Sequence, residues 1–262
     1  MTSSFQRDIG RGVISFETGK LAQQANGSVL VKHGDNVLLV TATMAKPREG
    51  IDFFPLTVEI EERLYARGKI PGSFFRREGR PSTDSILIAR MTDRPIRPLF
   101  PKGFRNEVQI VITPLSSDTE TPFDTLALTG ASAALTISDI PFEGPISATR
   151  VAYLDGEYLV NPTYDEITES ALDIIVAGSR DGVVMMEAGA KQVSEDIVLE
   201  AIRRAQELNL ELISLQDETE RAVGKPKAEY QRRAYDPDLT AAVASSMGDR
   251  LRDALAAPVA DR

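Results

Sequence analysis

The chain has no cysteine, no tryptophan and one histidine among its 262 residues. The absence of cysteine excludes disulfide bonds, thiolate metal sites and thiol nucleophiles, and it fits a reducing, cytoplasmic location. The single histidine, His33, has no second histidine or cysteine with which to share a metal ion, so we expect a structural or solvated side chain. No apolar run approaches the roughly 20 residues that cross a bilayer, and the N-terminal segment lacks the apolar core of a signal peptide. We therefore expect no contact with a membrane.

The composition that remains is sufficient for a large folded core. Hydrophobic residues make up 42% of the chain and charged residues 26%, which are ordinary fractions for a globular protein. A chain of this length buries about 70% of its unfolded surface without a metal or disulfide. One large domain, or a medium domain with a smaller element, fits this length.

Charge is distributed unevenly along the chain. The net charge is −9, which disfavours nonspecific attraction to nucleic acid. Residues 63–105 nevertheless hold eleven basic and three acidic residues, a net of +8, and leave 19 basic and 36 acidic residues elsewhere, a net of −17. A polyanion would therefore be repelled by most of the chain and attracted to this basic window, residues 63–105.

Apolar segments separated by turn residues predict an antiparallel sheet with three β-hairpins. The hairpin turns lie at residues 34–36, 155–156 and 178–182, and a further strand covers residues 107–115. Asp155 and Gly156 suit the positive φ angles of a type I′ turn.

Helical patterns interrupt the predicted strands. A helix is predicted from residue 83 until Pro95, which should end it because proline lacks an N–H group. A second, buried helix should begin with Thr121 as its N-cap, since small residues such as Gly130 permit close packing on a sheet. A third, amphipathic helix should begin at Ser194.

The strand signals end near residue 210. From there the sequence predicts helices separated by Gly224 and Pro226, and Asp236 followed by Pro237 marks a clean helix start.

The segment "PGSFFRREGRPSTDS", residues 71–85, places two phenylalanines beside two arginines in a loop. Phe74 and Phe75 would offer stacking surfaces to bases, and Arg76 and Arg77 would contact phosphates. In the alternative interpretation, one phenylalanine anchors the loop in the core and the arginines pair with carboxylates of residues 59–62.

A second group of arginines follows on the predicted helix. Arg90 and Arg94 are four residues apart and share a helix face, and Arg97 follows shortly after. These residues would form either a row of anion contacts or a surface ion-pair row with Asp93 or Glu78, and the spacing alone favours neither.

Three segments together resemble a known family: "GRGVISFETGKLAQQANGSVLVKHGDNVLLVTATM", "ERLYARGKIPGSFFRREGRPSTDSILIARMTDRPIRPLFPKGF" and "LTGASAAL". They are similar to the N-terminal portion of the bacterial polynucleotide phosphorylases, the polyribonucleotide nucleotidyltransferases. The resemblance implies an α+β fold with an RNase PH-like core, in which mixed or antiparallel sheets pack with helices in a ribosomal-protein-like βα arrangement. Residues 1–212 would form this first core, and residues 213–262 would begin an all-helical linker domain whose remainder is missing.

The family's activity is implied in the same way. Its members degrade single-stranded RNA processively from the 3′ end with inorganic phosphate as co-substrate, release nucleoside diphosphates and thereby degrade mRNA. Three subunits form a ring around a channel, and Mg²⁺ or Mn²⁺ assists at a second core. The resemblance also implies association with other proteins of RNA degradation.

In the family, the catalytic pattern belongs to that second core. Alignment of its "DFKVAG" with "DIIVAG" here retains Asp173, but it puts Ile175 in the place of a lysine and Ile167 in the place of an upstream aspartate. Isoleucine neither holds a cation nor donates to an oxyanion. Asp173 is therefore the single, weak catalytic candidate, no metal ligand is expected in this segment, and the segment alone should be inactive.

The resemblance places the arginines and phenylalanines of the basic window along the RNA path. The candidate RNA-binding residues are Phe74, Phe75, Arg76, Arg77, Arg80, Arg90, Arg94 and Arg97. The alternative to a subunit of an exoribonuclease is a non-catalytic RNA-binding or ring-scaffold protein with a degenerate core, and a weaker third interpretation makes the basic window a protein-docking surface.

Overall fold

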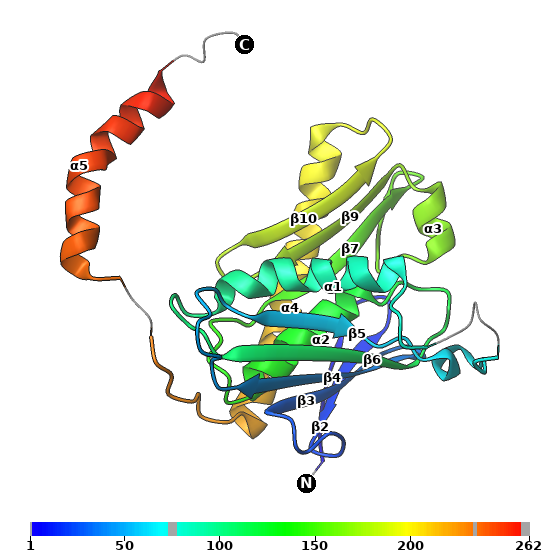
Figure 1. Cartoon of the computed structure of the whole chain (residues 1–262). Coiled ribbons are helices and arrows are strands. Elements are labelled where there is room, and N and C mark those ends of the chain that lie inside the picture. The colour runs from blue at the N-terminus through cyan, green and yellow to red at the C-terminus, as the bar shows by residue number, and fades with distance from the viewer. Residues whose placement is uncertain (1, 73–77, 233–234, 258–262) are drawn as a thin grey trace.

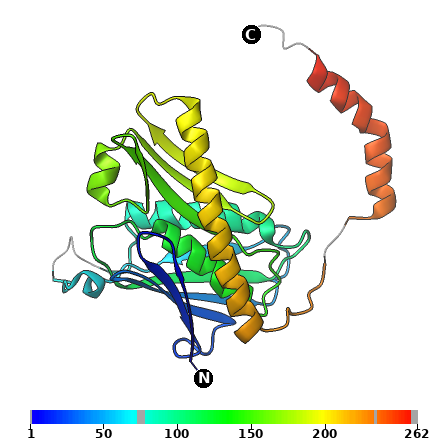
Figure 2. The same cartoon turned by 180° about the vertical axis from the view of Figure 1, so that it is seen from behind.

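The computed structural model describes residues 2–72, 78–232 and 235–257. Two β-sheets form the body of the molecule, with helices packed between and beside them, and one further helix lies apart from this body (Figures 1 and 2). None of the described helices is long and apolar enough to cross a lipid bilayer. The fold is the α+β arrangement of mixed and antiparallel sheets packed with helices that the sequence predicts.

The first sheet has six strands in the order β1-β2-β3-β4-β6-β5. All neighbours are antiparallel except β5, which runs parallel to β6, so the sheet is mixed. Among the described strands, β5 pairs only with β6, so it forms an edge of the sheet. The strands are β1 (Ser3–Asp8), β2 (Val13–Thr18), β3 (Gly27–His33), β4 (Asn36–Ala45), β5 (Leu56–Ile60) and β6 (Glu107–Ser116).

The second sheet has four antiparallel strands in the order β10-β9-β7-β8. Asp155 and Gly156 connect β7 to β8 with φ angles of 49° and 86°, as the predicted turn requires. The three predicted hairpins are therefore confirmed. The strands are β7 (Ser147–Leu154), β8 (Glu157–Val160), β9 (Leu172–Gly178) and β10 (Val183–Ala190).

Helix α2 (Asp124–Ile137) is buried along its whole length and packs against β3, β4 and β7. A Cβ on Gly130 would lie 2.8 Å from Val31 and 2.9 Å from Val40, so glycine permits the close approach of this helix to the first sheet. The buried helix predicted from small residues is confirmed. Its predicted N-cap is wrong, because the Thr121 hydroxyl is bonded to Asp118 and the helix begins at Asp124 without a side-chain cap.

Helix α1 (Thr83–Ile96) lies beside β5 and includes Pro95, so the predicted end of this helix before the proline is also wrong. The helix continues because, two residues after the proline, the N–H group of Arg97 still donates to the carbonyl of Asp93. A short 3₁₀ turn (Arg97–Leu99) follows. Another 3₁₀ turn (Leu64–Arg67) precedes α1, and a one-and-a-half-turn helix, α3 (Tyr164–Glu169), connects β8 to β9.

Helix α4 (Glu195–Val223) begins after Ser194, as predicted, and packs against β7 and β9. It passes residue 212 without interruption, and Leu212, Ile213 and Leu215 are buried. The division into a core at 1–212 and a helical domain from 213 stays a prediction.

The segment after α4 crosses the end of α2 before it leaves the body. The Lys227 ammonium group donates to three backbone carbonyls, those of Leu135, Thr136 and Ser138, at 2.8–3.0 Å. Helix α5 (Pro237–Ala256) then begins at the predicted Asp236 cap and has no buried residue.

Candidate nucleic-acid interface

Helix α1 carries the central part of the basic window and begins at a hydrogen-bonded cap. The Ser82 hydroxyl accepts from the N–H of Ser85 at 3.1 Å. The Glu62 carboxylate in turn accepts from the Ser82 N–H at 3.1 Å and from its hydroxyl at 2.9 Å. These contacts fix the start of α1 against the residues that follow β5.

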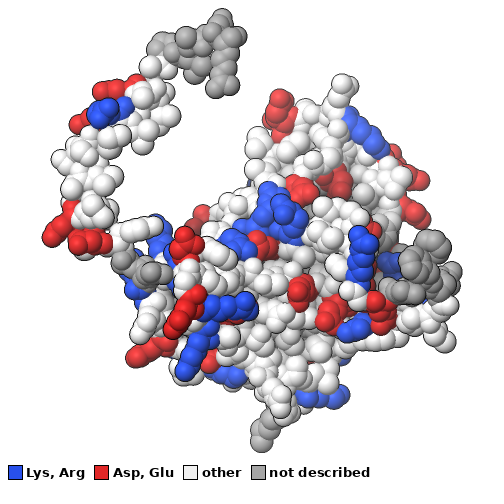
Figure 3. All heavy atoms as spheres, in the orientation of Figure 1, with Lys and Arg blue, Asp and Glu red and all other residues white. Residues whose placement is uncertain are grey.

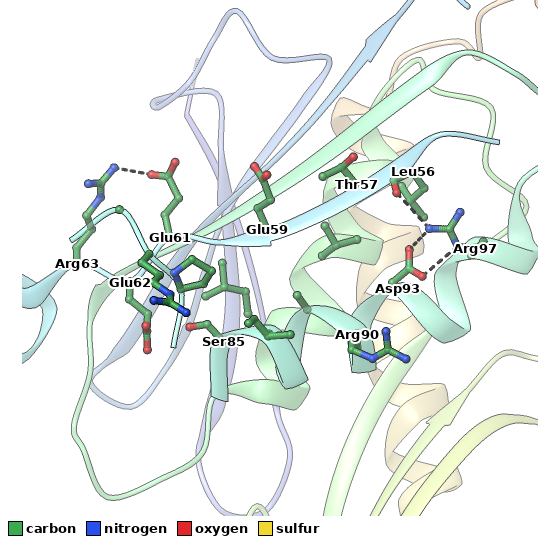
Figure 4. A pocket seen from close by; sticks show the side chains of 17 residues that line it. Leu56, Thr57, Glu59, Glu61, Glu62, Arg63, Ser85, Arg90, Asp93 and Arg97 are labelled. Atoms are coloured by element: carbon green, nitrogen blue, oxygen red, sulfur yellow. Dashed lines mark hydrogen bonds and ion pairs between the residues drawn. The ribbon is translucent and has the colours of Figure 1, made fainter. Parts of the chain in front are cut away.

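A groove of about 540 Å³ lies between α1 and the free edge of β5 (Figure 4). Its walls are apolar near the strand and charged at both sides. The charged residues that line it are Glu59, Glu61, Glu62, Arg63, Arg80, Arg90, Asp93 and Arg97.

Two of the predicted RNA-binding arginines are engaged by the protein itself. Arg97 contacts both carboxylate oxygens of Asp93, at 3.0 and 2.7 Å, and donates to the carbonyls of Phe54 and Leu56, each at 3.1 Å. Arg94 lies 3.2 Å from Glu187 on β10. The predicted ion-pair row is thus realised at Arg97, where the guanidinium has no free edge for a phosphate.

Arg80 and Arg90 differ from these two arginines, because neither makes an ion pair or hydrogen bond with any residue in the described ranges. Both line the groove, and Figure 4 shows Arg90 projecting from α1. On the face drawn in Figure 3, basic side chains gather over α1 with carboxylates among them. The structure therefore brings Arg80, Arg90 and Arg97 to one groove and leaves two of them available to a ligand.

The aromatic part of the predicted site, Phe74, Phe75, Arg76 and Arg77, lies outside the described residues. Immediately after it, the Glu78 carboxylate accepts from the backbone N–H of Leu64 at 2.9 Å and lies 3.4 Å from Arg63. Glu78 therefore pairs with Arg63 and not with the arginines of α1.

Asp173, the weak catalytic candidate, belongs to a separate buried cluster. The Arg150 guanidinium lies between two carboxylates, 3.0 Å from Asp124 at the start of α2 and 3.0 Å from Asp173 on β9. The side chains of Asp124, Arg150 and Asp173 keep only 12%, 16% and 25% of their exposure. One cation therefore neutralises two carboxylates in a site with little solvent.

Burial raises the pKa of both carboxylates. Desolvation raises the pKa of Asp124 above its ordinary value, and the charge of Arg150 opposes this rise without cancelling it. Burial also raises the pKa of Asp173, where Arg150 again opposes the rise and Asp124 adds to it. The guanidinium is shared, so its charge is already balanced by protein groups and is not available to an anion.

The sequence singled out Asp173, whose catalytic role stays a prediction, but it did not indicate Asp124 and Arg150 as its neighbours. The available signal was a charged residue, Asp124, at the start of an otherwise apolar helix, which requires a buried cation nearby. Ile175 lies in the hydrophobic core. Among the described residues, no group of three His, Asp or Glu side chains is placed to hold a metal ion. His33 lies at the surface with Nε2 3.1 Å from the Arg11 carbonyl.

Comparison with known families identifies the two halves of this body. Residues 13–141 match domain 1 of the 3′ exoribonuclease family, and residues 144–207 match its domain 2. The chain belongs to the 3′ exoribonuclease family. The two matches meet between α2 and β7, where the first sheet and its helix pass to the second sheet.

Individual relatives place the chain more narrowly. It is 52% identical over 252 residues to a polyribonucleotide nucleotidyltransferase of Thermomicrobium roseum, a match that covers 96% of this chain and 32% of that protein. It is also 52% identical over 251 residues to the enzyme of that name from Halothermothrix orenii, covering 96% and 36%. The resemblance to the N-terminal portion of these proteins is confirmed, and the chain spans about a third of the length of the curated relatives it matches.

A solved structure supports the fold alone. Rice Rrp46 superposes with a TM-score of 0.60 at 14% identity, covering 84% of this chain and 94% of that one.

Proposed function

We propose that this chain is part of a phosphorolytic 3′ exoribonuclease that degrades single-stranded mRNA processively and releases nucleoside diphosphates. The observation that carries the proposal is the 52% identity to polyribonucleotide nucleotidyltransferases over 96% of the chain. In this reaction an oxygen of inorganic phosphate attacks the phosphorus of the 3′-terminal linkage. The bond to the penultimate 3′ oxygen breaks, so the terminal nucleotide leaves as a diphosphate and the RNA keeps a 3′ hydroxyl.

In the proposal this segment grips RNA and takes part in a ring of three subunits, and a second core performs the chemistry. Arg80 and Arg90 are the best-supported contacts, since no described residue pairs with them and they share one groove. Arg94 would contact RNA after exchange of its partner Glu187, whereas Arg97 would position α1 beside β5. The loop residues 74–77 would add base stacking and phosphate contacts.

The residues of this core do not fit the phosphate and metal chemistry. Arg150 is balanced by two carboxylates, and isoleucines stand at 167 and 175 where the resemblance requires an aspartate and a lysine. Mg²⁺ or Mn²⁺ would polarise the reacting phosphate, and in the proposal it binds at the second core. In the proposal, this core contributes to the reaction by holding the RNA in position with its arginines close by.

The experiment separates gripping from cleavage. The 262-residue chain is mixed with 5′-labelled oligoadenylate, phosphate and Mg²⁺, and both bound RNA and released ADP are measured. We expect salt-sensitive binding without ADP. Release of ADP by this chain alone would refute the proposal that this core lacks catalytic residues. Absence of RNA binding would refute the proposal that this segment binds RNA.

Variants then assign the contacts. Replacing Phe74 and Phe75 by Ala should weaken oligoadenylate binding by about 5- to 150-fold per stacked base, at an unchanged melting temperature. Replacing Arg76 and Arg77 by Ala should reduce the salt slope of binding by about 2, one unit for each lost phosphate contact.

The matched control is the adjacent pair Arg203 and Arg204 on α4, which is engaged by Glu200. Its replacement by Ala should leave the slope unchanged. Equal slopes for both double variants would remove residues 76 and 77 from the RNA path. A chain that binds RNA and fails to restore phosphorolysis to a second core would favour the alternative, a non-catalytic RNA-binding ring scaffold.

A further inference from the structure

The outer edge of β5 carries backbone groups that the described protein leaves unpaired. The N–H of Glu61 donates to Ile112 on β6, and the carbonyl of Pro55 accepts from Val108 at the start of β6. Because successive residues of a strand point their backbone groups to opposite edges, the odd-numbered residues of β5 face β6 and the even-numbered ones face the groove. In the described part of the chain, the groove-facing N–H and C=O groups of Val58 and Ile60 have no partner.

The two ends of this edge are closed. At one end, Arg97 occupies the carbonyls of Phe54 and Leu56. At the other end, Glu62 holds Ser82 at the start of α1. The open stretch is therefore restricted to Val58 and Ile60, which suits an extended chain of about four or five residues at 3.3 Å per residue.

Charge differs between the two sides of the groove. Figure 4 shows Glu59 and Glu61 on the side of β5 away from α1, and Arg90 on α1. Glu61 is neutralised by Arg63. Among the described residues, Glu59 accepts only from the uncharged amide of Gln109, at 2.9 Å, and has no cation as partner.

On the side of α1, the unpaired charges along the open stretch are positive. Asp93 is neutralised by Arg97. Glu62 has no cation as partner among the described residues, but it lies at the closed end of the edge, where it accepts from Ser82. Arg80 and Arg90 are left without a counter-ion among the described residues. An extended chain in this groove would meet a negative charge on one side and two positive charges on the other.

We propose that the groove binds an extended peptide segment of another protein, which adds as a strand to the edge of β5. Alternate side chains of an added strand point to opposite faces, so its acidic residues would contact Arg80 and Arg90 while a basic residue contacts Glu59. The backbone groups of Val58 and Ile60 supply the hydrogen bonds that hold the strand in register.

Two other occupants fit less well. A second copy that joined through its own β5 would bring Glu59 and Glu61 against the same carboxylates, and like charges facing across strands are destabilising. RNA held by Arg80 and Arg90, as proposed above, would use the α1 side of the groove, because phosphates placed along β5 would face Glu59 and the carbonyls of Val58 and Ile60. The alternating pattern of donors, acceptors and charges is that of a polypeptide partner.

The test uses a fluorescein-labelled seven-residue peptide with Glu at alternate positions and Lys and Thr between them. Fluorescence anisotropy measures its Kd for the 262-residue chain. A peptide of the same composition, with its acidic and basic residues grouped into blocks, is the ligand control. We expect the alternating peptide to bind at least tenfold more tightly than the block peptide, and equal affinities would overturn the proposal.

Variants of β5 then test the site. Val58→Pro removes a donor that faces away from β6, a position at which an edge strand accepts proline. It should raise the Kd about three- to tenfold, the value of one hydrogen bond. Val58→Ala keeps the N–H and is the matched control, and melting temperatures verify that both variants fold. Equal Kd values for the two variants would refute strand addition.

Charge reversal at Glu59 gives an independent readout. Glu59→Lys should weaken binding of the peptide with central Lys and strengthen binding of its counterpart with central Glu. Oligoadenylate binding should be unaffected by Val58→Pro, because the RNA proposal uses no backbone group of β5, whereas Glu59→Lys removes a negative charge from the groove and should strengthen it. If Val58→Pro changed RNA affinity and left peptide affinity unchanged, the edge of β5 would belong to the RNA path and the peptide proposal would fail.

Discussion

The shared guanidinium of Arg150 gives the sharpest test of the core. Replacement by Met preserves most of the side-chain volume but leaves the carboxylates of Asp124 and Asp173 without their cation. Breaking a buried ion pair by removing one partner costs about 3–5 kcal/mol. Because the three side chains retain 12–25% of their exposure, we expect Arg150→Met to lower the free energy of unfolding by about 3 kcal/mol, the lower end of this range.

The loss should depend on pH in a defined direction. The folded-state pKa values of Asp124 and Asp173 are already raised by burial, and removal of Arg150 raises them further. A carboxylate with a raised folded-state pKa binds more protons in the folded than in the unfolded chain, so stability increases as pH falls through that pKa. The deficit of Arg150→Met should therefore shrink between neutral pH and the ordinary carboxylate pKa of about 3.9.

Urea denaturation followed by circular dichroism at several pH values measures the free energy of unfolding. Arg180→Met is the matched control, since its pair with Asp217 is at the surface and contributes about 1 kcal/mol or less. Adding Asp124→Asn and Asp173→Asn to Arg150→Met should recover part of the lost stability. A loss below about 1 kcal/mol, or a deficit that stays constant with pH, would refute the assignment of a charge-balanced cluster.

Three further predictions concern the packing of the body and its boundary. Gly27→Ala would place a Cβ 2.0 Å from the Ala134 carbonyl oxygen, so α2 must move away from β3. Thermal unfolding should show a loss of about 1–3 kcal/mol in the free energy of unfolding. Gly189→Ala is the control, because its Cβ would have no atom within 4 Å. Lys227→Met should cost about 2 kcal/mol in the same assay because three carbonyls lose a charged donor, and an unchanged stability would mean that water replaces it. Limited trypsin digestion should cut first at Arg232, an exposed residue beyond that contact, and early cleavage within α4 would contradict this order.

Local chemistry explains why much of the fold was predictable. The turn at Asp155 and Gly156 needs two positive φ angles, and these residues adopt them at little cost. The start of α5 follows from Asp236, whose side chain accepts from the N–H groups of Asp238 and Leu239. Strand β5 was not predicted, because a five-residue strand is decided by its parallel pairing with β6, a contact between residues about 50 positions apart.

The candidate site was predictable in part, for a related reason. Spacing placed Arg90 and Arg94 on one helix, and the structure has both there. No sequence pattern indicated that Arg97 would donate to the carbonyls of Phe54 and Leu56, since backbone acceptors have no signature in side-chain chemistry. Arg150 was missed for a different reason, because its two carboxylates come from α2 and β9, which only the tertiary fold brings together.

The charge of the basic window overstates what a polyanion would meet, because its cations find partners outside the window. Arg63 pairs with Glu61, and Arg94 pairs with Glu187, more than 90 residues away. In each such pair the carboxylate offsets the positive charge of the guanidinium, so the pair attracts a distant phosphate less. The count of basic residues in 63–105 does not show this loss of attraction. In the described part of the groove the attraction is concentrated at Arg80 and Arg90, and Glu59 opposes it from the other side of β5. A ligand that presents only phosphates gains from two of these charges and is repelled by the third, whereas a strand with alternating charges gains from all three.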